Sequence, residues 1–282
     1  MNSPMLAFLL IFLLATGAFA AEQNDVEFSR PGGIPLTLDL KTPSGPGLFP
    51  AAIIVHGGGF VNGNKRTYVT PLFDTLSNAG FAWFTINYRM APDYPFPAAI
   101  DDTENAIRWV ESHAAEYHID TARIALIGES AGGYIVAYVG THLPPDLRLA
   151  GVVDFYGPND MVLQIQKHAP PDLSKPHHPG AMEFFSVKEM NQSALDRLRD
   201  LSPLNAIHPG MPPFLFIQGT ADEQVPYEQS PKMCEAMRKI GATCEVITVK
   251  NGRHGMGSWE KHPEMAHWKP EMITWLKKTL QR

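Results

Sequence analysis

The residues that most clearly suggest chemistry form a G-x-S-x-G stretch at residues 128–132, with Ser130 at its centre. The apolar residues 123–127 before it are typical of a buried strand, and residues 133–139 after it can form a helix. A sharp strand-to-helix turn exposes its serine and requires small neighbours. Because a serine hydroxyl is a weak nucleophile at neutral pH, a base must activate it. We therefore expect Ser130 to be a nucleophile in acyl transfer.

A glycine-rich segment, His56-Gly57-Gly58-Gly59, directly follows the apolar run of residues 51–55. Glycines allow backbone N–H groups to approach a substrate oxygen closely, and each such donor typically contributes about 3 kcal/mol to an oxyanion. We expect Gly58, Gly59 and Ala131 to supply these donors, although a glycine triplet can also be a plain turn. His56 is expected to be a structural hydrogen-bonding residue rather than the base.

The acid that orients the base should follow a later strand. Asp222 comes just after the apolar residues 213–218, at the carboxyl end of that predicted strand. Loops at this end face the ligand in open α/β sheets. Glu223, Asp160 and Asp154 are the alternatives, but only Asp222 lies one strand before a suitable base.

That base is expected to be His254, which follows residues 245–249 and precedes the last predicted helix. It is one of eleven histidines, but it alone fits the order Ser, Asp, His. The histidines show no H-x-x-x-H or similar spacing on a helix. We therefore expect no metal site, and acyl transfer by this triad needs no cofactor.

Strand-like and helix-like stretches alternate along the chain, which predicts an α/β fold. About eight strands are expected to form a mostly parallel sheet with helices on both faces. The expected strands span residues 25–28, 36–41, 51–55, 81–86, 123–127, 151–155, 213–218 and 245–249. The expected helices span residues 69–78, 97–114, 130–142, 228–240 and about 265–280.

One segment, at about residues 160–201, interrupts this alternation after the sixth strand. It is rich in Pro, His, Met and Phe and contains no clear strand. Long insertions of this kind often act as lids, so we expect a lid-like insertion. The alternative is a surface elaboration that covers the sheet edge. Residues 21–282 are otherwise expected to form a single domain.

Composition and the N-terminus narrow the classes of function. The formal net charge is −6 and there is no basic run, so nucleic acid is not an expected partner. Residues 6–20 are apolar and end in Ala18-Phe19-Ala20, which is typical of a signal-peptidase site. We expect residues 1–20 to be a signal peptide, the protein to be secreted or periplasmic, and the mature chain not to be a membrane protein. An uncleaved membrane anchor is the alternative, since residues 1–5 carry no Lys or Arg.

The two cysteines agree with export. Cys234 falls in a predicted helix and Cys244 in the strand that follows, with a turn at Gly241. Seven helical residues and three strand residues each rise about 10 Å from that turn. A disulfide between them is expected in an oxidising compartment, with two separate buried thiols as the alternative.

From about Val26 to its end, the chain resembles the α/β-hydrolase superfamily. Three segments resemble the HGGG esterases within it: residues 56–59, residues 87–92 (Asn-Tyr-Arg-Met-Ala-Pro) and residues 95–99 (Pro-Phe-Pro-Ala-Ala). The chain is most similar to the bacterial acetylxylan/feruloyl esterase-like group, as in Val153-Asp-Phe-Tyr-Gly-Pro-Asn-Asp160. The resemblance also implies that Tyr88-Arg89 and Asp101-Asp102 fix the loop beneath the site.

These observations together predict a serine esterase that acts on short-chain acyl or aryl esters. Its substrates are expected to be small-molecule or polysaccharide esters, with acetyl or feruloyl groups on plant polysaccharide as candidates. A serine peptidase of the prolyl-oligopeptidase type is one alternative, because it shares the order Ser, Asp, His. A non-catalytic binding module on a hydrolase fold is the other. The sequence does not indicate the oligomeric state.

Overall fold

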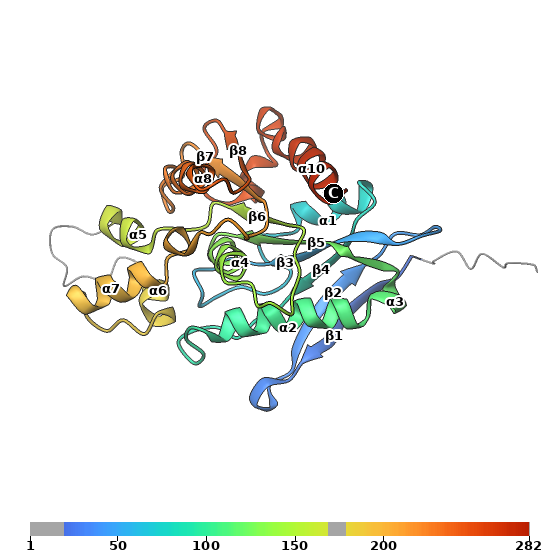
Figure 1. Cartoon of the computed structure of the whole chain (residues 1–282), viewed down its shortest axis with the longest axis horizontal. Helices are drawn as coiled ribbons and strands as arrows, with labels where there is room; N and C mark the ends of the chain where they lie inside the picture. The colour runs from blue at the N-terminus through green and yellow to red at the C-terminus, as the bar shows by residue number, and fades with distance from the viewer. Residues whose placement is uncertain (1–19, 169–178, 282) are drawn as a thin grey trace, which may run out of the picture.

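A computed structural model describes residues 20–168 and 179–281 of the protein. Eight strands form one sheet in the order β1-β2-β4-β3-β5-β6-β7-β8 (Figure 1). These strands are β1 (Glu22–Ser29), β2 (Leu36–Lys41), β3 (Phe49–Val55), β4 (Ala82–Ile86), β5 (Ile119–Glu129), β6 (Gly151–Phe155), β7 (Phe214–Gly219) and β8 (Cys244–Val249). The pairs from β4 to β8 are parallel, whereas β1 with β2 and β2 with β4 are antiparallel. The expected mostly parallel sheet is therefore confirmed.

Helices cover both faces of this sheet, and alternate residues of each strand belong to different cores. In β3, Ile53 belongs to the core that includes residues of α2, α4 and α8, whereas Ile54 belongs to the core that includes residues of α1 and α10. The helices are α1 (Pro71–Asn78), α2 (Ala98–Ser112), α3 (Ala114–Tyr117), α4 (Ala131–Thr141), α5 (Met161–His168), α6 (Pro179–Phe184), α7 (Gln192–Asp200), α8 (Gln229–Lys239), α9 (Met256–Trp259) and α10 (Trp268–Thr279). Short 3₁₀ turns lie at Pro31–Gly33, Pro203–Ala206 and Pro263–Met265. Burial on two faces explains why the central strands are continuous apolar runs.

Several boundaries differ from the sequence-based expectation. β5 begins at Ile119 rather than residue 123, because Ile119 pairs with Phe49 beyond the apolar run. The helix expected at residues 97–114 is broken at His113 into α2 and α3. The last helix begins at Trp268, after a separate turn, rather than at about residue 265. These differences lie at element ends, where local pairing decides the boundary.

The segment expected as an insertion contains helices α5, α6 and α7, which lie together at one end of the molecule (left in Figure 1). The edge formed by β1 and β2 lies on the other side. The insertion contacts the glycine loop, because a Cβ on Gly180 would lie 2.2 Å from the Gly59 carbonyl oxygen. Its residues 169–178, and residues 1–19 of the predicted signal peptide, lie outside the described residues. A lid function therefore stays a prediction.

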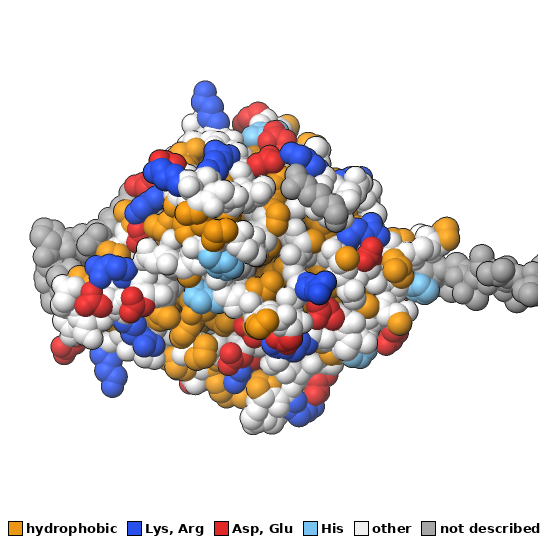
Figure 2. Space-filling model, viewed as in Figure 1, with side chains coloured by type: hydrophobic (Ala, Val, Ile, Leu, Met, Phe, Trp, Pro, Cys, Tyr) orange, Lys and Arg blue, Asp and Glu red, His pale blue; other side chains and the backbone are white. Residues whose placement is uncertain are grey.

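Cys234 of α8 and Cys244 of β8 form a disulfide, with their Cα atoms 5.6 Å apart. It fastens a helix to the edge strand that leads into the loop of His254. The face in Figure 2 carries Lys and Arg interspersed with Asp and Glu, with hydrophobic side chains between them. Within residues 20–168 and 179–281, no helix combines the length and the apolar character needed to cross a bilayer.

Candidate active site

Ser130 lies at a strained turn between β5 and α4, with φ +55° and ψ −114°. The glycines two residues before and two residues after it have no room for a side chain. A Cβ on Gly128 would lie 2.1 Å from the Gly132 carbonyl oxygen, and one on Gly132 would lie 2.2 Å from the Val55 carbonyl oxygen. A non-glycine residue at positive φ is uncommon and is retained where the surrounding structure enforces it. The two glycines thus allow β5, α4 and β3 to pack closely enough to hold Ser130 in this conformation.

The structure brings Ser130, His254 and Asp222 together from three separate loops. His254 Nε2 lies 2.8 Å from Ser130 Oγ, and His254 Nδ1 lies 2.7 Å from Asp222 Oδ2. Asp222 Oδ1 also accepts hydrogen bonds from the backbone N–H groups of Gln224 and Val225, each at 2.9 Å. The Asp222 side chain is fully buried and that of His254 is 10 % exposed. These bonds fix the carboxylate, and the carboxylate in turn fixes the imidazole tautomer that can accept the Ser130 proton.

The alternative acids considered from the sequence lie elsewhere. Glu223 is exposed and pairs with Arg253 at 3.2 Å. Asp160 pairs with Lys232 at 2.6 Å. Asp154 is fully buried, but its oxygens bond to the backbone N–H of Gly157 and to Asn159 rather than to the histidine. These bonds hold the turn after β6, and Asp154 Oδ1 lies against the elbow, 2.4 Å from where a Cβ on Gly133 would be. Burial raises the pKa of Asp154 to about 6.

The glycine loop lies beside the nucleophile in a conformation that requires glycine. Gly58 has φ +109°, and a Cβ there would lie 1.9 Å from the Asn62 carbonyl oxygen. Gly59 has φ +63°. Both line a cavity together with Ser130, while Ala131 begins α4. Among the described residues, no hydrogen-bond acceptor faces the N–H groups of Gly58, Gly59 or Ala131, so they are available to a substrate oxygen.

The residues beneath this loop have the structural roles that the sequence suggested for most of them. The His56 ring stacks on Tyr88 at 4.4 Å, and the Tyr88 hydroxyl donates to the His56 carbonyl oxygen at 3.1 Å. Burial lowers the pKa of His56 to about 4, so it is neutral. Arg89 donates to Asp102 through its backbone N–H and its guanidinium. Asp101 is exposed and, among the described residues, makes no hydrogen bond to this pair, so it acts on Arg89 only through its charge, which corrects the equal role expected for it.

Glu129, which directly precedes the nucleophile, was not singled out from the sequence. Its carboxyl lies against the glycine loop, since a Cβ on Gly57 would lie 1.9 Å from Glu129 Oε2. Burial raises the pKa of Glu129 to about 7, an effect partly offset by His254 and by a hydrogen bond from Tyr156. The signal available in the sequence was its position directly before the nucleophile.

Tyr156 is a second residue that the sequence did not reveal. Its ring meets the ring of His254 edge to face, with 4.7 Å between centroids. The Tyr156 hydroxyl accepts a hydrogen bond from the backbone N–H of Met256 at 2.7 Å. Tyr156 is fully buried, so it supports the imidazole and the loop that carries it.

Two cavities meet at Ser130 and His254. The smaller, of about 160 Å³, reaches toward the insertion, where Met161 and Ala181 line it. The larger, of about 400 Å³, extends past Tyr68 and Ser258. A reacting ester needs room on both sides of its carbonyl carbon, and the two cavities supply that room.

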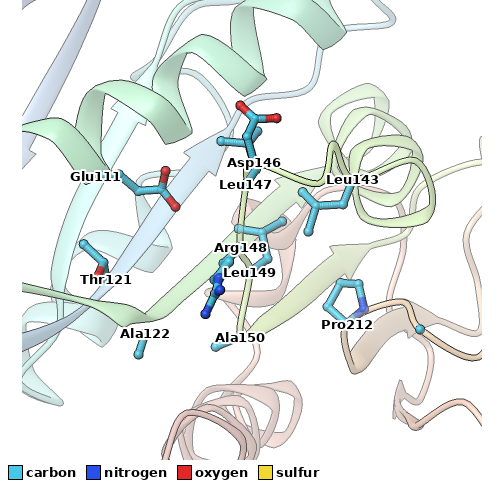
Figure 3. Close-up of a pocket in the computed structure, with 11 residues that line it drawn as sticks. Glu111, Thr121, Ala122, Leu143, Asp146, Leu147, Arg148, Leu149, Ala150 and Pro212 are labelled. Carbon is cyan, nitrogen blue, oxygen red and sulfur yellow. The ribbon is translucent and has the colours of Figure 1, made fainter.

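A third cavity, of about 580 Å³, lies away from the triad, by the amino ends of β5 and β6 (Figure 3). Glu111 of α2 and Thr121 of β5 flank it on one side and Pro212 on the other, with Arg148 between them. It contains neither the serine nor the histidine of the triad. Although this cavity is larger than either cavity at Ser130, we do not assign the reaction to it.

The fold and the serine–histidine–aspartate array define an α/β-hydrolase. Residues 38–237 match the BD-FAE family, and the chain belongs to this family. It is 30 % identical over 204 residues to the "Probable carboxylic ester hydrolase LipM" of Mycobacterium tuberculosis, a match that covers 69 % of this chain and 46 % of LipM. It is 41 % identical over 223 residues to the "Carboxylesterase NlhH" of the same species, covering 73 % of this chain and 66 % of NlhH.

Among solved structures, the chain resembles a "Truncated form of carbohydrate esterase from gut microbiota". The TM-score is 0.79 and the identity 25 %, over 93 % of this chain and 97 % of the other. By contrast, this chain spans only about half the length of the curated mycobacterial relatives, 46 % for LipM and 58 % for "Esterase LipQ".

Proposed function

We propose that the protein is a serine carboxylic-ester hydrolase. The observation that carries this proposal is the hydrogen-bonded chain from Ser130 Oγ through His254 to Asp222, at 2.8 and 2.7 Å. The names of LipM and NlhH support it. The open N–H groups of Gly58 and Gly59 beside Ser130 add the element that a tetrahedral oxyanion requires.

The first half of the reaction forms an acyl-enzyme. Ser130 Oγ attacks the ester carbonyl carbon while its proton passes to His254 Nε2. Asp222 stabilises the imidazolium, and the N–H groups of Gly58, Gly59 and Ala131 donate to the oxyanion. The bond from carbon to the alcohol oxygen then breaks, and His254 Nε2 returns the proton to the departing alcohol.

The second half reverses these roles with water. His254 Nε2 removes a proton from a water molecule while the oxygen of that water attacks the acyl carbon on Ser130. The tetrahedral intermediate collapses, the bond to Ser130 Oγ breaks, and the proton held by His254 returns to the serine. The products are a carboxylic acid and an alcohol, and no cofactor takes part.

The smaller cavity favours short acyl groups. Its volume of about 160 Å³ equals that of about five liquid waters at roughly 30 Å³ each. Pockets for drug-sized ligands begin at about 300 Å³. An acetyl group fits in this volume, whereas a feruloyl group, which contains an aromatic ring, needs a larger one. We therefore favour acetyl over feruloyl esters, carried on a polysaccharide, as the natural substrate; the likeness to a carbohydrate esterase supports the carbohydrate part.

Export to the periplasm or the medium is part of the same proposal. An intact polysaccharide does not enter a cell, so its esterase must act outside the cytoplasm. The Cys234–Cys244 disulfide supports this location, since such bonds persist in oxidising compartments. Cell fractionation with N-terminal sequencing tests it, and a mature start near Ala21 is the expected result.

An ester panel tests the function. p-Nitrophenyl esters from acetate to octanoate, acetylated xylan, methyl ferulate and a set of peptide amides should be compared on the wild type and on Ser130→Ala. We expect turnover to be highest for acetyl esters and to be lost in Ser130→Ala. Peptide turnover equal to ester turnover would instead support a peptidase of the prolyl-oligopeptidase type. No turnover of any substrate would support a non-catalytic module.

A further inference from the structure

The two cavities at Ser130 differ in a way that assigns the two halves of the ester. His254 lines both of them, but Gly255, Gly257 and Ser258, which follow it in the chain, line only the larger. The leaving alcohol oxygen must take its proton from His254 Nε2. Because the larger cavity continues along the chain that follows His254, we place the alcohol half there and the acyl half in the smaller cavity, whose volume favours a short acyl group.

The lining of the larger cavity suits an alcohol that carries several hydroxyl groups. Asn62 and Ser258 line only this cavity, and their side chains carry amide and hydroxyl groups. The smaller cavity is lined by Phe60, Met161 and Val225 but also by Gln164, and Gln224 lines both cavities. The larger cavity thus offers room and hydrogen-bonding groups for a polyhydroxylated alcohol, and the smaller one offers room for a small acyl group.

Tyr68 stands out among the residues that line the larger cavity. It is 49 % exposed, although most large hydrophobic side chains of the described chain are buried. Its φ is +68°, a conformation that costs a bulky L-residue roughly 1–2 kcal/mol. Strained backbone of this kind persists where the surrounding structure enforces it, and it concentrates at ligand sites.

The chain on both sides of Tyr68 is anchored, so the ring is held outward. Val69 is fully buried in the core beneath α1. Lys65 is also buried; its ammonium donates to Thr37 Oγ1 at 3.0 Å and pairs with Asp25 and Asp39. The exposure of Tyr68 is therefore a fixed feature of the loop rather than the result of a loose segment.

We propose that Tyr68 is the stacking platform of a leaving-group subsite for a pyranose ring, formed by the larger cavity beside His254. Pyranose C–H bonds pack against the negatively polarised face of an aromatic ring, and the amide and hydroxyl groups around Tyr68 bind the sugar hydroxyls. The proposal rests on the esterase function proposed above. Tyr68 touches the alcohol half alone, so it determines specificity without taking part in the reaction steps.

The test compares two substrates that share an acyl group and differ in the alcohol: peracetylated methyl xyloside and ethyl acetate. In Tyr68→Ala, kcat/KM for the xyloside should fall about three- to tenfold, the range expected for one aromatic contact. The value for ethyl acetate should change less than twofold. Tyr68→Phe, which keeps the ring, should retain the wild-type preference. Leu48→Ala serves as the matched control, because Leu48 is 55 % exposed and does not line the cavity.

Two results in Tyr68→Ala would overturn the subsite, and a third would come from the wild type. One is an equal loss on both substrates in Tyr68→Ala, and the other is no loss on the xyloside. A wild type that hydrolyses ethyl acetate but not the acetylated xyloside also overturns it while the esterase function stands. A wild type that hydrolyses neither ester, and whose serine resists a fluorophosphonate probe, removes the proposed function itself.

Discussion

The elbow around Ser130 and the insertion at residues 160–201 meet at the same site but are built in different ways. In the elbow, backbone packs on backbone, with no room for a Cβ on Gly128 or Gly132. The insertion reaches the site through side chains of α5 and α6, among them Met161 and Ala181. From this comparison we expect the packed sheet to fix the reacting groups and the insertion to select the acyl group. Substitutions in the two regions should therefore have different kinetic signatures.

The largest effect is expected in the triad. Asp222→Asn keeps the shape of the side chain but no longer stabilises the imidazolium or the required tautomer of His254. We expect kcat to fall roughly 10⁴-fold for every ester, with KM nearly unchanged. Asp160→Asn is the control, because it makes the same change in a surface ion pair. A loss confined to one class of acyl group would contradict the division between the two regions.

A backbone change in the glycine loop should have the next largest effect. The Cβ of Gly58→Ala would collide with the Asn62 carbonyl oxygen at a φ of +109°. We expect the oxyanion donors to move and kcat to fall roughly 10²- to 10³-fold for all chain lengths. Gly257 lines the same cavity, and no atom lies near a Cβ added there. Gly257→Ala should therefore retain activity. Similar activity in the two variants would show that the loop does not hold the oxyanion.

Glu129 allows the packing around the elbow to be tested through stability. The folded-state pKa of Glu129 is raised to about 7 from 4.5. The buried carboxyl thus stabilises the fold when protonated, and this stabilisation is lost as pH rises from 4.5 through 7. A glutamine at this position does not ionise, so Glu129→Gln does not show this loss. Between pH 4.5 and pH 8, its free energy of unfolding should therefore rise by on the order of 3 kcal/mol relative to that of the wild type.

Urea unfolding at several pH values measures this difference. The loss due to Asp154, whose pKa is also raised, occurs in both proteins and cancels. The exposed Glu189→Gln is the control and should follow the wild type. Parallel stability curves for the wild type and Glu129→Gln would mean that Glu129 is not held in a dry environment beneath the glycine loop.

The smallest effect is expected in the insertion. Met161→Ala enlarges the smaller cavity, and Ala181→Leu fills it. We expect the ratio of kcat/KM for butyrate over acetate esters to rise about tenfold in the first variant and to fall in the second. Met272→Ala, a buried methionine of α10 away from the site, should leave the ratio unchanged. An unchanged ratio in both insertion variants would show that the acyl group lies elsewhere.

The same difference between the regions explains what the sequence could predict. The strands are buried on both faces, so they appear as apolar runs, and parallel strands bring their carboxyl ends to one edge. Ser130, Asp222 and His254 each follow such a run, and their positions could be read from the order of elements. The sequence also indicated the glycine loop, because its three glycines directly follow a buried strand and lie upstream of the elbow.

The remaining features depend on tertiary contacts that leave no pattern in the sequence. The insertion has no regular period, so α5, α6 and α7 were not predicted. The exposure of Tyr68 follows from the burial of Lys65 and Val69 on either side of it. Tyr156, directly after β6, supports His254 across about a hundred residues of sequence. Such contacts are set only once the sheet has assembled.

Covalent labelling of the nucleophile tests the central claim most directly. The protein should be treated with a fluorophosphonate probe, digested, and mapped by mass spectrometry, with Ser130→Ala and Ser202→Ala in parallel. The account predicts one modified peptide, with the probe on Ser130, absent in Ser130→Ala and retained in Ser202→Ala. An unlabelled wild type, or a label on another residue that persists in Ser130→Ala, would contradict it.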